Sequence, residues 1–81
     1  MKLNRISKQQ AEHIIVYGQD KGFNMIKLGG EPYTIYHREY ENTFYDILQM
    51  NTLSNDEQEC VTTFYILDSN EVDKMFNRKK V

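Results

Sequence analysis

In this 81-residue chain, the stretch from Cys60 to Leu67 reads CVTTFYIL. Its β-branched and aromatic residues suit the pleated, half-buried surface of a β-sheet. No other stretch of the chain favours a strand so strongly. We therefore expect a strand over 60–67 that lies centrally in a sheet.

Two capping boxes predict a helix at each end of the chain. Ser7 with Gln10, and Asp68 with Glu71, have the spacing at which each side chain accepts a hydrogen bond from the backbone N–H of the other residue. Apolar residues follow both boxes at helical spacing. We expect the first helix over 7–21, with Gly22 as its left-handed stop. The predicted buried stripes consist of Ala11, Ile14, Ile15 and Gly18 in the first helix, and of Val72, Met75 and Phe76 in the last.

A β-hairpin is predicted after the first helix. Its strands, Phe23–Leu28 and Tyr33–Tyr40, flank Gly29-Gly30, which can adopt the positive φ angles of a tight hairpin turn. Pro32 donates no backbone hydrogen bond, so it belongs at the start or the edge of the second strand. That strand alternates between one face with Tyr33, Ile35, His37 and Glu39 and another with Thr34, Tyr36, Arg38 and Tyr40.

The remaining segments complete the predicted sheet. A turn is expected at Glu41-Asn42, and residues 43–50 fit either a strand or a helix, of which we favour the strand. Residues 51–58 are polar and predict an exposed loop. The whole pattern predicts one α+β domain, an antiparallel sheet of about four strands flanked by an N-terminal and a C-terminal helix, in the order α-β-β-β-β-α. We expect both helices on one face of the sheet, which leaves the other face for water or a partner.

Charge is segregated along the chain, although the net charge is only −2. Nine acidic residues and no Lys or Arg lie between Glu39 and Asp73, whereas the first 38 residues have a net charge of +3 and the last eight add four bases. Three of the acids belong to the start of the last helix, where acids are favoured. The other six have no basic neighbour in sequence: Glu39, Glu41, Asp46, Asp56, Glu57 and Glu59.

Half of the ten aromatic residues lie beside these acids, between Tyr33 and Tyr45. Aromatics are good strand formers, so half-buried sheet positions are one interpretation. Tyrosine also offers a large contact area at little entropic cost, and carboxylates pair with Arg and Lys. We therefore predict that the partner is a protein with a basic surface, bound by the six acids with Tyr36 and Tyr40 as anchors.

Two other functions stay open. Tyr33, Tyr36, Tyr40 and Arg38 could form a platform that stacks single-stranded nucleic acid, but the acid-only stretch opposes phosphate binding, so we expect no direct nucleic-acid partner. Alternatively, the chain is a structural subunit that forms a homodimer through its open sheet, since small domains often gain stability by association.

Nothing in the sequence predicts catalysis. His13 and His37, expected at the surface, have no Cys or His at ligand spacing, and Cys60 has no adjacent base. We expect no enzyme activity, no catalytic residue, no metal site and no cofactor. The longest apolar run, residues 14–17, is far shorter than the roughly 20 residues of a membrane helix, and no apolar signal segment follows the N-terminus, so we expect a cytoplasmic location without membrane contact.

In general character the chain resembles the small acidic proteins, rich in tyrosine and asparagine, that phages and mobile elements encode. Some of these inhibit host nucleic-acid enzymes, including CRISPR effectors, by occupying basic clefts. The resemblance is compositional. It implies a non-enzymatic inhibitor, anti-CRISPR-like or DNA-mimic-like, and assigns no role to any residue.

Overall fold

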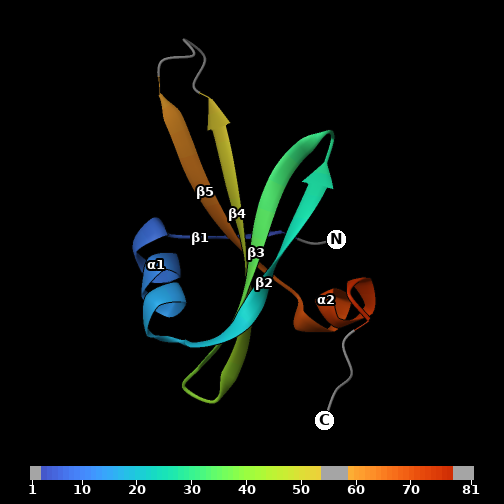
Figure 1. The fold of residues 1–81 in the computed structure, drawn as a ribbon. Helices are drawn as coiled ribbons and strands as arrows, with labels where there is room; N and C mark the ends of the chain where they lie inside the picture. Colours follow the sequence, from blue (N-terminus) through green and yellow to red (C-terminus); the bar gives the residue numbers. More distant parts are fainter. Residues whose placement is uncertain (1–2, 54–58, 78–81) are drawn as a thin grey trace.

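The fold is built on one antiparallel sheet of five strands (Figure 1). The computed structural model describes residues 3–53 and 59–77. The elements follow the order β1 (Asn4–Ile6), α1 (Lys8–Tyr17), β2 (Gln19–Leu28), β3 (Glu31–Tyr40), β4 (Thr43–Leu53), β5 (Cys60–Leu67) and α2 (Ser69–Met75). The strands lie in the order β1-β5-β4-β3-β2. The predicted α+β class is confirmed, and the sheet has one more strand than expected because β1 pairs with β5.

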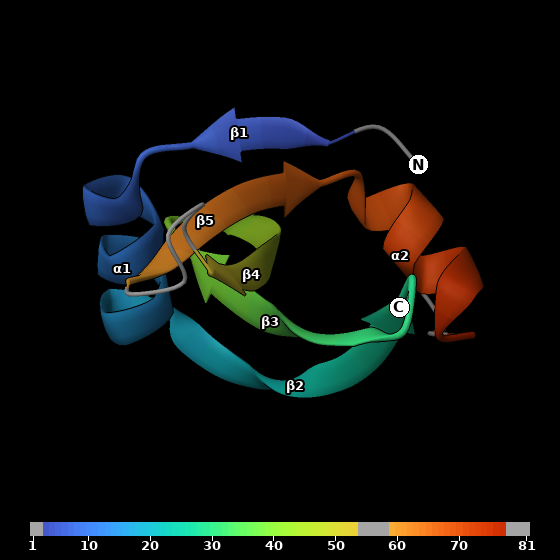
Figure 2. The ribbon, with the colours of Figure 1, turned by 90° about the horizontal axis from the view of Figure 1, so that it is seen from above.

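The two helices cover opposite faces of the sheet (Figure 2). Consecutive residues of a strand point to opposite faces. Ile47 of β4 belongs to a hydrophobic cluster with Ala11 and Ile14 of α1, whereas the next residue, Leu48, belongs to a cluster with Val72 of α2. The expectation that both helices share one face is therefore wrong. Apolar residues occupy both faces of the central strand, so each face needs a helix to exclude water.

The first helix begins where predicted and ends earlier. Ser7 is its N-cap, and the Ser7 hydroxyl oxygen accepts a hydrogen bond from the backbone N–H of Gln10 at 3.2 Å. The predicted end at residue 21 is wrong, because the chain becomes extended at Gly18 and enters β2 at Gln19. A Cβ atom at residue 18 would lie 2.4 Å from the carbonyl oxygen of Ile14, so only glycine permits this close exit from the helix.

Both predicted hairpin turns are confirmed. Gly29 and Gly30 join β2 to β3 with φ angles of 61° and 88°, and Glu41 and Asn42 join β3 to β4 with φ angles of 51° and 60°. Positive φ at both central residues is the pattern of a type I′ turn, whose twist matches that of the flanking strands. Pro32 lies near the start of β3, as expected.

The sheet divides into two hairpin arms at one end. The pairing of β3 with β4 stops at Thr34 and Gln49, while the β2–β3 pairing and the β4–β5 pairing continue beyond that level. Figure 1 shows the β2–β3 arm and the β4–β5 arm diverging. Residues 43–50 form the favoured strand, but residues 51–53 extend β4 and are not the predicted loop. The rest of that loop, 54–58, lies outside the described residues.

The strand at 60–67 is confirmed as β5. Its expected central place belongs to β4, because β5 is second from the edge and pairs with the short β1 only at residues 64–66. After β5, the Asp68 carboxylate caps α2 by accepting a hydrogen bond from the backbone N–H of Asn70 at 2.8 Å. Val72 is buried and Phe76 is half-buried, as predicted. Met75 is 45% exposed and is not part of the buried stripe, because α2 ends there after only seven residues.

The two N-caps generate the first prediction. Ser7→Ala and Asp68→Ala should each lower the free energy of unfolding by about 1 kcal/mol, because a backbone N–H of the first helical turn loses its acceptor. Urea denaturation followed by circular dichroism measures the change. Gln9→Ala, at an exposed position of the same first turn, is the control and should change stability by less than about 0.5 kcal/mol. Equal effects in all three variants would contradict the capping roles.

Candidate interaction site

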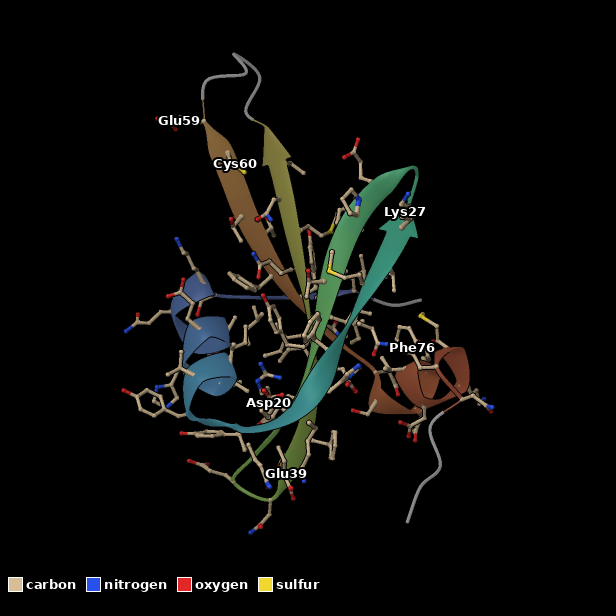
Figure 3. The ribbon with its side chains drawn as sticks, viewed as in Figure 1. Asp20, Lys27, Glu39, Glu59, Cys60 and Phe76 are labelled. Carbon is tan, nitrogen blue, oxygen red and sulfur yellow. The ribbon has the colours of Figure 1, made fainter. Side chains whose placement is uncertain are left out.

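The predicted acidic residues do not gather on one face of the described structure. Figure 3 shows Glu39 and Glu59 at opposite ends of the molecule. Glu41 lies in the β3–β4 turn, close in sequence to Glu39. Asp46 has no exposed surface, and the two remaining acids, Asp56 and Glu57, lie outside the described residues.

Glu39 also has a basic neighbour that its local sequence does not reveal. The ammonium nitrogen of Lys21 in β2 lies 3.6 Å from a carboxylate oxygen of Glu39, and both side chains are about one-third exposed. The antiparallel pairing of β2 with β3 brings these residues together from 18 positions apart in the chain. Glu39 is therefore partly neutralised, whereas the linear charge pattern predicted an isolated acid.

Asp46 belongs to a buried polar network on the face that α2 covers. An Asp46 carboxylate oxygen lies 2.6 Å from Nδ1 of His37, and Nε2 of the same ring contacts the side-chain oxygen of Asn24. The ring of Phe76 meets the imidazole edge-on, with 5.9 Å between the ring centroids. His37 is 4% exposed, so its predicted surface position is wrong. The prediction of Asp46 as a partner contact is corrected as well, because its carboxylate is used inside the fold.

This network joins three neighbouring strands and offers little to a substrate. Asn24, His37 and Asp46 come from β2, β3 and β4, so the network fixes how these strands are aligned on one face. A carboxylate and a histidine also begin a catalytic triad, but here the third member is an amide and not a nucleophile. Within residues 3–53 and 59–77, no group of three or more His, Cys, Asp and Glu side chains could hold a metal ion.

Arg38 is the equivalent buried polar residue on the face that α1 covers. Its side chain is 9% exposed, and its guanidinium lies 5.3 Å from the centroid of the Tyr36 ring. Its hydrogen bonds in the described structure are all made to oxygen atoms of the chain itself, so this guanidinium is a structural group and is poorly placed to bind phosphate. Its acceptors are the carbonyl oxygens of Ile15 at 3.1 Å, Gly22 at 3.0 Å and His37 at 2.9 Å, and the Asp20 carboxylate at 3.1 Å.

The possible platform for nucleic acid is divided between the two faces of the sheet. Tyr33 packs against the cluster on the α2 face, whereas Tyr36 and Tyr40 lie on the α1 face, as the alternation predicted. The Tyr36 hydroxyl donates a hydrogen bond to the Gln49 side chain at 2.9 Å. With Arg38 buried, these residues do not form one basic aromatic platform.

A partly exposed aromatic cluster does form at the turn end of β3, where Tyr40 is half-buried against the core of the α1 face. We call it the hairpin-end patch: His13, Tyr17, Tyr40 and Glu41. The centroid of the His13 ring lies 4.7 Å from that of Tyr17 and 5.4 Å from that of Tyr40. Nε2 of His13 is also 2.8 Å from the Tyr40 hydroxyl oxygen. Tyr17 is 70% exposed. The patch thus combines ordered rings with an exposed carboxylate.

The surroundings of Tyr40 in the patch change the acidity of its phenol. Loss of hydration raises the pKa of the Tyr40 phenol above its ordinary value of 10.0, and the nearby Glu41 carboxylate raises it further. Tyr40 and Glu41 were predicted as partner contacts, whereas His13 and Tyr17 were not. The missed signal is their spacing: residues four apart on a helix are neighbours on its surface.

Comparison of the chain with protein-family models, with curated proteins and with solved structures finds no significant match in any of the three. Neither helix of the described structure is long and apolar enough to span a membrane. The site is therefore interpreted from its own geometry.

The buried network on the α2 face generates the second prediction. Asp46→Ala should lower the free energy of unfolding by about 2 to 4 kcal/mol, because it leaves a buried imidazole nitrogen without its acceptor. Urea denaturation is the measurement. The double variant His37→Leu/Asp46→Leu should recover part of the loss, since apolar side chains replace both polar groups. A single variant as stable as the parent chain would contradict a structural role for this pair.

Tyr40 generates the third prediction. The pKa of Tyr40 is higher in the folded chain than its ordinary value of 10.0. Its phenol therefore contributes fully to the free energy of unfolding at a pH below about 10, and this contribution is lost as the pH rises through the pKa of the folded state. The ultraviolet absorbance titration of the parent chain, minus that of Tyr40→Phe, should show a midpoint above 10.0. Glu41→Gln should move this midpoint downward, because the negative charge of Glu41 is one of the causes of the raised pKa. A Tyr40 midpoint at or below 10.0 would contradict the assignment.

Proposed function

We propose that the chain is a non-enzymatic interaction protein that binds a basic surface of another protein through the hairpin-end patch. The observation that supports this most is the cluster in which the exposed rings of His13 and Tyr17 lie beside the half-buried Tyr40, with the exposed Glu41 next to it. Tyr17 is 70% exposed, and contiguous exposed apolar groups with polar residues at their rim are typical of an interaction site.

The patch is ordered before any partner arrives. The His13 ring contacts both tyrosine rings, and its nitrogen also contacts the Tyr40 hydroxyl. Glu41 is in a two-residue turn, which limits where its carboxylate can lie. Side chains that are already ordered lose less conformational entropy on binding, so more of the contact energy remains as affinity.

The chemistry of the patch favours cationic side chains. The face of a tyrosine ring attracts a guanidinium or an ammonium group, and Tyr17 presents such a ring largely to solvent. Glu41 supplies a carboxylate at the rim of the patch, and Glu39 lies at the same end of the molecule. Arg suits this combination best, because it can stack on a ring and donate to a carboxylate at once.

The biological role that we favour is inhibition of a host protein that processes nucleic acid, in the cytoplasm. Such proteins present Lys and Arg to phosphates, which is the surface chemistry that the patch fits. The described acids lie at both ends of the molecule, so the proposal rests on the aromatic patch and not on an extended row of carboxylates that imitates DNA.

The fourth prediction tests the patch against a partner recovered by pull-down. Tyr17→Ala should weaken binding by about 2 kcal/mol or more, mainly through faster dissociation, because an anchor ring is lost. Glu41→Lys should mainly slow association at low salt, since a rim charge steers a basic partner. Surface plasmon resonance at two salt concentrations separates the two rates.

Matched controls lie elsewhere on the surface. Glu31→Lys makes the same charge change next to the other hairpin turn, and Phe44→Ala removes a partly exposed ring from the opposite face of the sheet. Both should leave the rates unchanged. If the two controls change binding as much as the patch variants do, or if the chain itself binds DNA or RNA tightly in a salt-sensitive manner, the proposal is wrong.

A further inference from the structure

The second strand forms one edge of the sheet and exposes apolar side chains there. β2 pairs with β3 on one side, and no other described strand lies beside it. Phe23 is 63% exposed and Met25 is 61% exposed. Both lie on the α1 face. Figure 1 shows the part of β2 that runs toward the β2–β3 turn at the outer edge of the β2–β3 arm, away from α1. This part of the edge is open to another chain.

The hairpin register shows which backbone groups face outward at this edge. In an antiparallel ladder, hydrogen-bonded pairs alternate with pairs that are not bonded to each other, and a two-residue turn is closed by a bonded pair, here Leu28 with Glu31. The next pair, Lys27 with Pro32, is therefore not bonded, which agrees with the missing N–H of proline. By this alternation the N–H and C=O groups of Phe23, Met25 and Lys27 point away from β3.

We propose that β2 pairs antiparallel with β2 of a second copy of this chain, about a two-fold axis at Met25. This proposal is independent of the hairpin-end patch. The two-fold register places Met25 opposite Met25 of the second copy and Phe23 opposite Lys27 of the second copy. All three outward-facing residues then find backbone partners, and the exposed apolar side chains become cross-strand neighbours.

The outward-facing backbone groups select this register over its neighbours. An axis one residue earlier, at Asn24, would place Lys27 opposite residue 21, in the irregular part of the ladder between Asp20 and Phe23. An axis one residue later, at Ile26, would place Phe23 opposite Gly29 of the turn. An axis at Phe23 would place Met25 opposite Lys21, where the ladder is irregular between Asp20 and Phe23. The axis at Met25 places a lysine opposite an aromatic ring, which is favourable for both the aliphatic stem and the ammonium group.

The structure also limits how far such pairing extends. Gly22, with a φ of 106°, lies in the irregular part of β2, and Arg38 holds its carbonyl oxygen. A bulge of this kind twists an edge away from a neighbouring chain. Pairing is thereby confined to the regular part of β2 after the bulge, which is the part with outward-facing groups and exposed apolar side chains.

The fifth prediction measures self-association of the full chain. Sedimentation equilibrium over a concentration series should show a monomer–dimer equilibrium, and Met25→Lys should raise its Kd at least about tenfold, because the axis then places two lysines opposite each other. Val16→Lys, at a 70% exposed position on α1, is the matched control and should leave the Kd unchanged. Circular dichroism checks that both variants are folded.

Cysteine cross-linking tests the register itself, in a Cys60→Ser background that removes the native thiol. Met25→Cys should form a disulfide-linked dimer, because opposed residues of a bonded pair have Cα atoms about 5.5 Å apart. Phe23→Cys should not, since the two copies of residue 23 are offset by about 13 Å along the strands. A chain that stays monomeric up to about 1 mM, a dimer unaffected by Met25→Lys, or cross-linking at 23 in preference to 25 would each overturn the proposal.

Discussion

The structure depends on the burial of one guanidinium group, that of Arg38. A charged side chain taken out of water is stabilised when its donors are bonded, and Nε and Nη1 of Arg38 donate to oxygens from the end of α1, from the irregular part of β2 and from β3. These contacts hold the point where the chain leaves α1 and becomes the edge strand. The positions of Tyr17 just before this point, and of Phe23 just after it, follow from the same contacts.

The neighbouring residue His37 makes the complementary contacts on the other face. Because Arg38 and His37 are consecutive in β3, a shift of the strand register by one residue would exchange their faces. Arg38 would then meet the Asp46 side of the sheet, and His37 would face the carbonyl groups that now bind the guanidinium. Both exchanges leave buried polar groups without their partners, so two adjacent polar residues specify the register more strictly than apolar residues would.

The features that could be predicted from the sequence are those with a local cause. Ser7 and Asp68 cap helices through residues two or three positions away, and Gly29-Gly30 turns the chain by its own φ angles. The partners of Asp46 and Glu39 come from other strands, so no local pattern revealed that one acid is buried and the other paired. In the hairpin-end patch, the pattern of acids and tyrosines predicted Tyr40 and Glu41 as partner contacts. His13 and Tyr17 could not be predicted, because they join the patch only through the packing of α1 against β3. The consecutive apolar residues Ile47 and Leu48 were the available sign that both faces are covered.

The hairpin-end patch and the edge of β2 are separate surfaces that one chain can use at the same time. The patch lies where α1 meets the β3–β4 turn, whereas the free backbone groups of β2 lie beyond the bulge, toward the other end of the molecule. Pairing two copies through β2 leaves both patches uncovered. When two patches are linked and the first binds a target with two basic sites, the second patch is held near its own site at a high effective concentration. The overall affinity for that target therefore rises without any contact beyond those of each patch. Self-association at the edge would therefore raise the avidity of modest patches, which suits a domain too small to offer one large interface.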